Sequence, residues 1–295
     1  MDSAITFSPL IIGTMRWGAW GANMETAAIE QLIDHCLALG LNDFDHADIY
    51  GHYTEEANFG RVIKRRPDLK SKIQITTKYG IKMMAENRPS HKIKSYNSSK
   101  EHLLFSVDNS LRSLGVDHID VLLVHRPDLL MDPHDIAEGY QQLHKAGKVR
   151  SFGVSNFTTH QFDLLNDLVP LITNQLEISL LQLDAFQDGT ITQCQRKGIR
   201  PTAWSPFGGG RIFSNEGDEQ SLRVRKTAQP LMEKYEATLD QILLAWLYKH
   251  PAGIIPVLGS SKSERITIAA QAQQIALEHE EWYSLWEASV GEEVP

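Results

Sequence analysis

Short runs of apolar, largely β-branched residues alternate along this chain with longer segments that have the apolar spacing of amphipathic helices. The runs predict strands near Leu10–Ile12, Asp43–Asp45, Ile73–Thr77, Ile119–Val124, Phe152–Val154, Ile172–Gln175, Pro201–Trp204 and Ile254–Leu258. The alternation repeats eight times without a linker or a break in composition. It therefore favours an α/β fold, a closed parallel (β/α)8 or TIM barrel that forms a single domain over residues 1–295.

Glycines support this fold and weaken its main rival. Four predicted helices finish with a glycine, where the left-handed conformation can end the helix, and these are Gly40, Gly115, Gly147 and Gly198. The rival is a doubly wound nucleotide-binding sheet. Its usual GxGxxG turn is absent, because neither the glycines at 18 and 21 nor those at 208–210 have that spacing.

Charge argues against polyanionic partners. The chain has 29 Lys and Arg against 37 Asp and Glu, a net charge of −8, and residues 278–295 hold six glutamates with no Lys, Arg or Asp. We therefore expect no nucleic-acid or membrane partner. The longest uninterrupted apolar run, Ile242–Tyr248, is also far too short to span a membrane.

The cysteines and the first residues bear on the compartment. Cys36 and Cys194 form no CxxC pair, and the chain begins with no basic segment followed by an apolar stretch. These features predict a reduced, cytoplasmic protein.

Nearly every predicted strand ends in a residue that can hydrogen-bond or react. In a parallel barrel these C-terminal ends converge on one face, where catalytic groups gather. The residues are Asp45 with Tyr50 five positions later, Lys78, His125, Ser155 with Asn156, Gln175, Ser205, and Gly259 to Ser261. A single residue of this kind more often has a structural role. The occurrence of such residues at successive strand ends, on one face of the barrel, predicts a catalytic site.

Four of these residues suit carbonyl reduction. A free tyrosine has a pKa of about 10, and a nearby lysine ammonium lowers it by stabilising the phenolate. Asp45 can hold the Lys78 ammonium toward Tyr50, and His125 can donate a hydrogen bond to a carbonyl oxygen. Together they predict a site that can donate a proton to a carbonyl and that needs a separate hydride donor.

Several stretches around these residues resemble the aldo-keto reductase superfamily. They are DHADIYG (45–51), TKYG (77–80), VHRPD (124–128), GVSNF (153–157), WSPFG (204–208) and GSSKSER (259–265). They follow the superfamily's order and spacing from Gly13-Thr14 to about Arg265, nearly the whole chain. The DHADIYG and HRPD segments are most similar to its bacterial oxidoreductase branch.

The resemblance implies an NADPH-dependent oxidoreductase that reduces aldehyde or ketone carbonyls to alcohols. By position, Tyr50 is the general acid, Asp45 and Lys78 tune it, and His125 orients the substrate carbonyl. NADPH would bind in extended form without a Rossmann domain. The expected partner is thus a small-molecule aldehyde or ketone, and a monomer or weak oligomer is the default assembly.

The resemblance also assigns cofactor contacts. Ser155, Asn156 and Gln175 would hold the nicotinamide carboxamide near Asp45, and Trp204 would stack under the ring. The ribose and pyrophosphate would lie along Gly13, Thr14, Ser205, Pro206, Phe207, Gly208 and Gly210, with Arg211 neutralising phosphate charge. Gly259, Ser260, Ser261, Lys262 and Arg265 would surround the 2′-phosphate at a helix N-terminus.

Two positions depart from the superfamily's pattern. Position 204 is Trp where the superfamily often has Tyr, which preserves stacking with a larger face. Downstream of Arg265, where Glu-Asn commonly grips the adenine, this chain has Ile268-Ala269. Either Gln271 or Gln273 is the candidate replacement for that grip.

Two other functions compete with a reductase. A metal-dependent barrel hydrolase would use His46, Asp48, His52, His125 and Asp128. No His-x-His follows the first strand, and the tyrosine motif already accounts for His46 and Asp48, so no metal is expected. A non-catalytic, regulatory NADPH-binding barrel is the second alternative, although this chain keeps all four catalytic residue types.

Loops and tail allow weaker predictions. Trp17, Trp20 and Tyr53 would form an apolar substrate wall or simply pack the loops. The longest connections are Lys82–Ser98 and Phe207–Gln220, and the basic charge of the first would attract an anionic substrate or lie solvated. Trp282, Tyr283 and Trp286 predict a C-terminal helix packed on the barrel.

Overall fold

All eight predicted strands are present in the computed structural model, which describes residues 5–214 and 218–295. They are β1 (Ile11–Gly13), β2 (Asp43–Asp45), β3 (Gln74–Tyr79), β6 (Ile119–Val124), β7 (Val149–Ser155), β8 (Leu171–Glu177), β9 (Thr202–Trp204) and β10 (Ile255–Leu258). They form a closed barrel in the order β1-β10-β9-β8-β7-β6-β3-β2. The predicted α/β class and parallel (β/α)8 barrel are confirmed.

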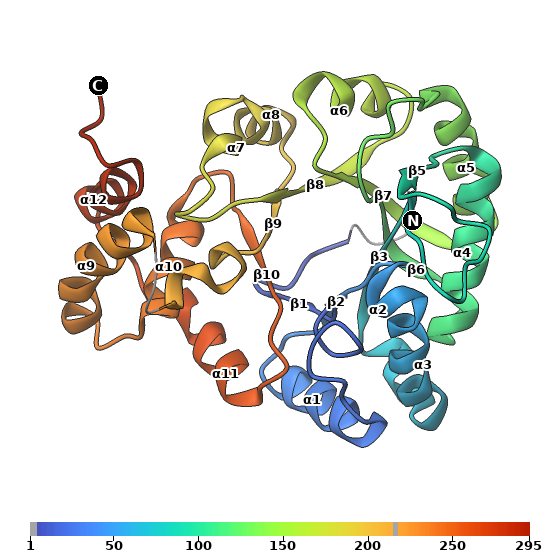
Figure 1. Ribbon diagram of the computed structural model, residues 1–295, viewed down its shortest axis with the longest axis horizontal. Helices are drawn as coiled ribbons and strands as arrows, with labels where there is room; N and C mark the ends of the chain where they lie inside the picture. Colours follow the sequence, from blue (N-terminus) through green and yellow to red (C-terminus); the bar gives the residue numbers. More distant parts are fainter. Residues whose placement is uncertain (1–4, 215–217) are drawn as a thin grey trace. The chain divides into compact units, whose positions relative to one another are not determined.

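Helices occupy the connections, as the apolar spacing predicts (Figure 1). The α-helices are α1 (Thr26–Ala38), α2 (Tyr50–Tyr53), α3 (Glu55–Arg65), α4 (Lys100–Leu114), α5 (Pro133–Lys145), α6 (Thr159–Asn166), α7 (Asp184–Gln187), α8 (Thr190–Lys197), α9 (Glu219–Lys234), α10 (Leu239–Lys249), α11 (Ser263–Gln271) and α12 (His279–Val290). Three 3-10 turns are η1 (Pro67–Ser71), η2 (Gly208–Phe213) and η3 (Ala272–Gln274). No helix in the described ranges is long and apolar enough to cross a membrane.

The helix-ending glycines have the predicted backbone. Gly40, Gly115, Gly147 and Gly198 all have φ between 67° and 74°. A side chain is strained in this left-handed region, whereas glycine enters it freely. Each glycine therefore turns the chain out of its helix and toward the following strand.

One long connection contains structure that the sequence did not suggest. Residues Ile81–Lys82 (β4) and Ser95–Tyr96 (β5) pair as a two-stranded antiparallel sheet. Strands of two residues show no alternation to detect, which explains why Lys82–Ser98 read as an irregular connection. In the other long connection, Phe207–Gln220, positions 215–217 lie outside the described residues.

The contacts between Cα atoms group the chain into two compact units. Unit 1 runs to Gln175 and includes Gly259–Ser263, while unit 2 comprises Leu176–Leu258 and Glu264–Pro295. The single-domain organisation over residues 1–295 stays a prediction.

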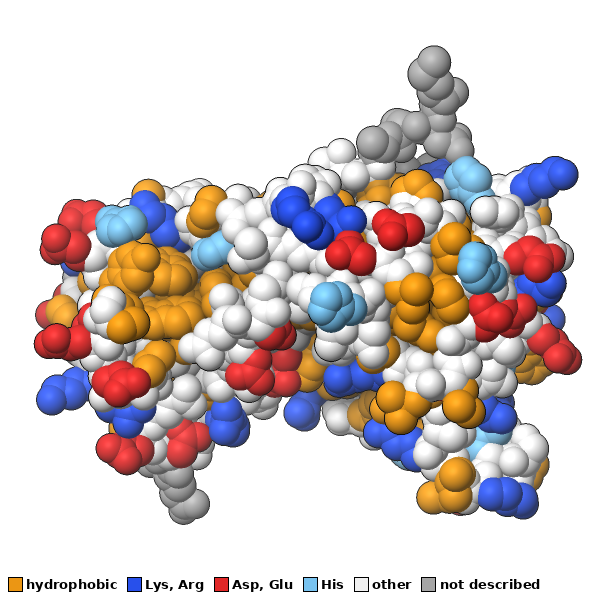
Figure 2. All heavy atoms as spheres, turned by 90° about the horizontal axis from the view of Figure 1, so that it is seen from above, with side chains coloured by type: hydrophobic (Ala, Val, Ile, Leu, Met, Phe, Trp, Pro, Cys, Tyr) orange, Lys and Arg blue, Asp and Glu red, His pale blue; other side chains and the backbone are white. Residues whose placement is uncertain are grey.

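The central barrel strands of unit 1 are buried on both faces. All six residues of β6, Ile119–Val124, are buried, which explains their continuous apolar run in place of strict alternation. At the surface, Figure 2 shows Lys and Arg interspersed with Asp and Glu on the face that it presents. That face carries no single basic patch of the kind that nucleic acids require.

Candidate active site

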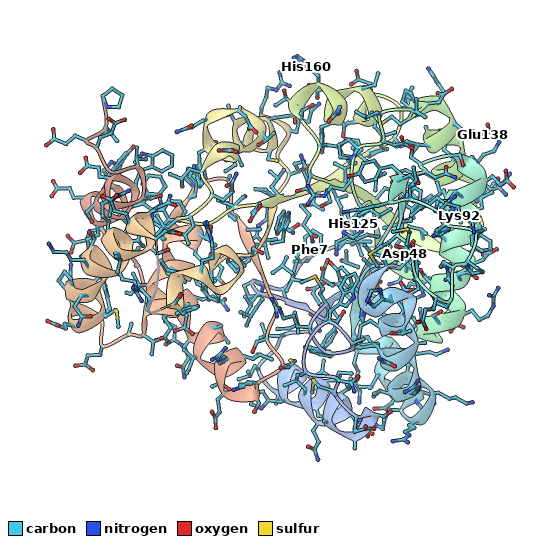
Figure 3. All side chains as sticks on the ribbon, viewed as in Figure 1. Phe7, Asp48, Lys92, His125, Glu138 and His160 are labelled. Atoms are coloured by element: carbon cyan, nitrogen blue, oxygen red, sulfur yellow. The ribbon has the colours of Figure 1, made fainter. Side chains whose placement is uncertain are left out.

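The four predicted catalytic residues come together within unit 1. Asp45 ends β2, Tyr50 begins α2, Lys78 lies in β3 and His125 follows β6. Figure 3 labels His125 and Asp48 on the loops after β6 and β2. We call Asp45, Tyr50, Lys78 and His125 the tetrad.

The Lys78 ammonium organises the tetrad. It donates hydrogen bonds to Asp45 Oδ2 at 2.6 Å, to the His46 carbonyl oxygen at 2.7 Å and to the Tyr50 hydroxyl at 3.1 Å. Lys78 is 1% exposed, and these three acceptors match the three N–H groups of an ammonium. The cation is thus fully satisfied and fixed in direction without water.

Burial and pairing set the protonation of Lys78 and Tyr50. Burial acts to lower the pKa of the Lys78 ammonium, but pairing with Asp45 and Tyr50 outweighs it and leaves that pKa raised. Burial raises the pKa of Tyr50 above 10, while Lys78 pulls it down by a smaller amount. The expected net lowering of the Tyr50 pKa is therefore wrong for this structure, because desolvation of the phenolate dominates. The phenol consequently holds its proton at neutral pH.

His125 lies beside the tyrosine as a neutral imidazole. The two ring centroids are 6.0 Å apart, with the planes at 78°. Burial, together with the positive charges of Lys78, Arg126 and Lys94, lowers the pKa of His125 well below 6.5. Its Nδ1 is buried without a hydrogen-bond partner. A buried ring nitrogen without a hydrogen-bond partner is uncommon in proteins, so this atom stands out among the polar atoms of the site.

The three predicted carboxamide-binding residues join the tetrad through Asp45. Gln175 Nε2 donates to Asp45 Oδ1 at 3.0 Å, and the Ser155 hydroxyl donates to the Gln175 carbonyl at 3.0 Å. Asn156 Nδ2 donates to Ser155 Oγ at 2.7 Å from a backbone with φ of 61°. Asparagine tolerates this left-handed conformation better than most residues. The structure thus groups amide and hydroxyl side chains next to the Asp45 carboxylate.

Gly13 and Thr14 support the site from β1. Gly13 pairs with Asp45 in the parallel register, and the Thr14 N–H donates to the Asp45 carbonyl at 3.0 Å. The Thr14 hydroxyl lies 3.0 Å from both the Asp45 carbonyl oxygen and His46 Nδ1. Because Thr14 is wholly buried, its side chain holds the end of β2 in place.

Two buried acids near the tetrad, Glu55 and Glu56, were missed in the sequence, whereas Asp48 was named only for the rival metal site. Burial raises the pKa of Glu55 and of Glu56 to about 7, and burial with repulsion from Glu56 raises that of Asp48 well above its ordinary value. Glu56 accepts a hydrogen bond from the Thr77 hydroxyl at 2.7 Å. A signal existed, because Glu56 shares a helical face with the apolar residues Phe59 and Ile63.

Of the residues proposed for the substrate wall, Trp17 is buried in the loop, and Trp20 stays a candidate. Trp17 is completely buried, and its indole N–H donates to the Ser260 carbonyl at 2.9 Å. It therefore packs the loop and offers no surface to a substrate. Trp20 is half-buried, with its ring centroid 6.0 Å from that of Tyr50 and 5.4 Å from that of His52.

Tyr53 anchors a strained turn. Residues Gly51, His52 and Tyr53, directly after the predicted acid, all have φ between 57° and 64°. Left-handed backbone costs a side-chain-bearing residue about 1–2 kcal/mol. The Tyr53 hydroxyl accepts from the Met83 N–H at 2.8 Å and lies 3.3 Å from the Met83 carbonyl oxygen. This tyrosine thus ties the turn to the 82–98 connection.

The turn has further contacts with the same connection. Asn87 Nδ2 donates to the His52 carbonyl oxygen at 3.0 Å, and the Arg88 guanidinium lies 4.4 Å from the centre of the Tyr53 ring. The basic 82–98 connection therefore supports the backbone that follows Tyr50. This structural role is separate from any attraction of its charge for an anionic substrate.

Unit 2 contains the predicted pyrophosphate segment. Trp204 is half-buried at the end of β9, and Ser205 has φ of 51°. Gly208, Gly209 and Gly210 also have positive φ, which glycine alone adopts without strain. Arg211 pairs with Asp218 at 3.4 Å, so its guanidinium already has an acidic neighbour.

The predicted 2′-phosphate residues flank the start of α11. In unit 1, Ser260 Oγ accepts from the Lys262 N–H at 3.2 Å, Gly259 has open space where a Cβ would stand, and Lys262 is exposed. In unit 2, Arg265 is exposed in the first turn of α11.

The adenine candidates behave differently from one another. Gln241 Nε2 donates to the Ile268 carbonyl oxygen at 3.1 Å and to Gln271 Oε1 at 3.4 Å. Gln271 is thus tied to α10, whereas Gln273 is exposed and bonds to the Ala270 carbonyl oxygen.

Two residues of the rival metal site, Asp128 and His46, have hydrogen-bond partners of their own. Asp128 accepts from the Ser98 N–H and hydroxyl and from the Leu130 N–H. His46 Nδ1 faces Thr14. Across residues 5–214 and 218–295, no group of three or more His, Cys, Asp or Glu side chains is arranged to hold a metal ion.

Comparison with known sequences gives one family. The model of the Aldo/keto reductase family matches residues 9–289. The chain is 44% identical to "Uncharacterized oxidoreductase YcsN" of Bacillus subtilis (strain 168), and the alignment covers 99% of this chain and 97% of the relative. It is 38% identical to a "6-dehydroglucose reductase" of Agrobacterium fabrum, over 100% of this chain and 98% of the relative.

Solved structures show the same fold. A thermostable aldo-keto reductase aligns with a TM-score of 0.80 and 23% identity, covering 97% of each chain. The glycerol dehydrogenase of Gluconobacter oxydans aligns with a TM-score of 0.85 and 22% identity, covering 98% of this chain and 92% of the other.

Proposed function

Because the chain belongs to the aldo/keto reductase family, we propose that it reduces a small aldehyde or ketone to an alcohol with NADPH and with Tyr50 as general acid. The family and its oxidoreductase relatives support carbonyl reduction in general. The observation that carries the finer proposal is the buried Lys78, which contacts both Asp45 and the Tyr50 hydroxyl.

The residues present fit a nicotinamide cofactor. Ser155, Asn156 and Gln175 place amide and hydroxyl groups beside Asp45, where a carboxamide can exchange hydrogen bonds. We assign Trp204 to the nicotinamide ring, and Lys262 and Arg265 to the 2′-phosphate. When bound, NADPH supplies a hydride for the carbonyl carbon.

Each member of the tetrad has one task in this proposal. The Tyr50 phenol, protonated at neutral pH, gives its proton to the carbonyl oxygen. Lys78 stabilises the phenolate that remains, and Asp45 keeps the ammonium charged and aimed. The neutral His125 donates a hydrogen bond to the carbonyl oxygen, which fixes the direction of that oxygen.

The test is a panel of aldehydes and ketones followed at the NADPH absorbance band, with Tyr50→Phe as the variant. The panel includes 6-dehydroglucose, because relatives 38% and 35% identical are named for it. Tyr50→Phe should lower kcat by about 10²–10⁴-fold, the usual contribution of general acid catalysis, and leave the NADPH Kd nearly unchanged.

The pH profile adds an independent readout. Because the Tyr50 pKa is raised above 10, wild-type kcat for reduction should hold through neutral pH and fall only in the alkaline range. Equal kcat values for wild type and Tyr50→Phe would remove Tyr50 from this role.

Cofactor preference tests the 2′-phosphate assignment. Charge-assisted hydrogen bonds contribute about 1.5–3 kcal/mol, so one such contact favours NADPH over NADH by roughly 10- to 100-fold. Arg265→Ala should weaken NADPH binding much more than NADH binding, and added salt should reduce the preference. Equal dissociation constants for the two cofactors in wild type would contradict the assignment.

A cytoplasmic location is part of the proposal. Both cysteines, Cys36 and Cys194, are free and buried, and burial raises the pKa of each thiol to about 12. Unreactive, unpaired thiols suit a reducing compartment.

A further inference from the structure

A group of aromatic side chains that carbonyl reduction does not use lies wholly within unit 2. Trp246 of α10 and Trp282 of α12 stack with ring centroids 5.0 Å apart and planes at 8°. Each indole N–H donates to the other residue's backbone carbonyl, at 3.1 and 3.0 Å. Phe186 of α7 packs edge-on against Trp246 at 5.4 Å. The rings are thus fixed by stacking and hydrogen bonds before any ligand arrives.

These rings form the wall of an open pocket of about 590 Å³. Its lining consists of Phe186, Trp282, Tyr283, Trp286, Val294 and Pro295. Trp286 continues the stack, 5.6 Å from Trp282 with the planes at 19°, and Tyr283 is 39% exposed. Figure 2 shows hydrophobic side chains gathered at one end of the face in view. The volume is within the usual range of small-molecule sites.

The segments that line this pocket are rich in acidic residues. Residues 184–188 and 278–295 contain two aspartates, six glutamates and no Lys or Arg. Two of the glutamates, Glu278 and Glu281, are paired with Lys234. Glu287 stays beside the pocket, because it accepts a hydrogen bond from the Val294 N–H at 3.4 Å. Arg223 also donates to the Ala288 and Ser289 carbonyl oxygens, so two cations adjoin this segment, and Glu287 is the carboxylate beside the pocket that favours a positive ligand.

We infer that the aromatic pocket of unit 2 binds a small organic cation whose nitrogen carries alkyl groups, such as a quaternary ammonium compound. Ring faces attract such cations, and four of the six lining residues are aromatic. No carboxylate side chain is among the six, so an ammonium with free N–H groups would find no side-chain carboxylate there to replace its hydrogen bonds to water. An alkylated nitrogen has none to lose, while the surrounding glutamates still attract its charge.

The first experiment compares choline with its neutral isostere 3,3-dimethylbutan-1-ol, using the full-length chain and ligand-observed saturation-transfer NMR. The two probes share a shape and differ in charge. Choline should bind saturably and about fivefold or more tightly than the alcohol, the difference expected of a cation over aromatic faces. Equal binding of the two probes, or no saturable binding of choline, would overturn the inference.

Variants locate the binding. Trp286→Leu keeps the site apolar but removes a ring face, and should weaken choline about fivefold or more. Tyr283→Leu, at an exposed position, is the second variant should Trp286→Leu fold poorly. Glu287→Gln can still accept from Val294 and should weaken choline about twofold, with less salt dependence.

A matched control is Phe105→Leu on α4, which removes a 60% exposed ring in unit 1 and should leave choline binding unchanged. Choline binding that is unaffected by both pocket variants, or that falls equally in Phe105→Leu, would place the cation elsewhere. The result is separate from the reductase proposal, because none of these residues belongs to the tetrad.

Discussion

The tetrad of unit 1 and the aromatic pocket of unit 2 both gather side chains from separate elements, but different forces hold them. At the tetrad, a cation that is 1% exposed is held by a carboxylate, a carbonyl and a phenol. In the pocket, uncharged rings stack and two indoles exchange hydrogen bonds with backbone carbonyls. A buried charge must be compensated almost completely, whereas each contact in a ring stack contributes only a small part of the stabilisation.

This difference predicts how each region responds to change. Removing one partner of a buried ion pair leaves a charge without compensation, which is far more costly than the pair is stabilising. Removing part of a ring stack loses contact area and at most one hydrogen bond. The three predictions that follow test this contrast, from the largest effect to the smallest.

Lys78→Met should have the largest effect. It leaves the Asp45 carboxylate buried without its cation, so we expect the free energy of unfolding to fall by about 3–5 kcal/mol. Carbonyl reduction at neutral pH should also be lost, because the Tyr50 phenolate would have no positive neighbour. Urea denaturation and NADPH turnover measure the two effects.

Two further variants serve as controls for Lys78→Met. Asp45→Asn should reduce activity less, because Lys78 is still present and keeps the His46 carbonyl and Tyr50 as acceptors. Lys92→Met, on an exposed lysine, should leave stability nearly unchanged. Wild-type activity and pH dependence in Lys78→Met would show that the proposed tuning of Tyr50 is wrong.

Glu56→Gln should have an intermediate effect whose size depends on pH. Burial raises the pKa of Glu56 from 4.5 to about 7, so the folded state keeps a proton that the unfolded state loses above pH 4.5. The free energy of unfolding therefore falls as pH rises from about 4.5 through 7, by at most about 3 kcal/mol from this group.

The glutamine variant removes that loss. Relative to wild type, it should gain about 1–3 kcal/mol at pH 8 and little at pH 4.5, measured by denaturation at both values. Its amide oxygen can still accept from Thr77. Glu101→Gln, at an exposed position of α4, should show no such dependence, and a gain in Glu56→Gln that does not change with pH would exclude burial of its charge as the cause.

Trp282→Phe should have the smallest effect. It keeps an aromatic ring against Trp246 but removes the indole N–H that donates to the Trp246 carbonyl. We expect a loss of about 1–2 kcal/mol in the free energy of unfolding and no change in reductase kcat. A loss as large as that of Lys78→Met would show that the contrast between the two regions does not hold.

Much of the fold and the tetrad was readable from the sequence. The spacing of apolar residues and the residue type at each strand end are local properties of the sequence. They predicted all eight strands, the helix-ending glycines and the grouping of the tetrad. Family motifs surround those residues, and the match over residues 9–289 agrees with them. The roles of the cofactor residues stay predictions.

Other features depended on the tertiary structure, because they arise between segments far apart in the sequence. For Trp17 the sequence left two alternatives, a substrate wall or loop packing, and the structure buries it against Ser260, 243 positions away. For Tyr53 the sequence left the same two alternatives, and only the structure shows that its hydroxyl bonds to Met83 of the 82–98 connection.

The direction of the Tyr50 pKa shift shows the physical reason most clearly. The sequence by itself determined that a lysine, an aspartate and a tyrosine would share one end of the barrel, because strand order and period fix which residues stand there. Whether the lysine or the apolar surroundings has the larger effect on the pKa of the Tyr50 phenol depends on how completely water is excluded. Desolvation is a sum over every neighbour in space, and folding alone sets that sum: it raises the pKa of Tyr50 despite the cation beside it.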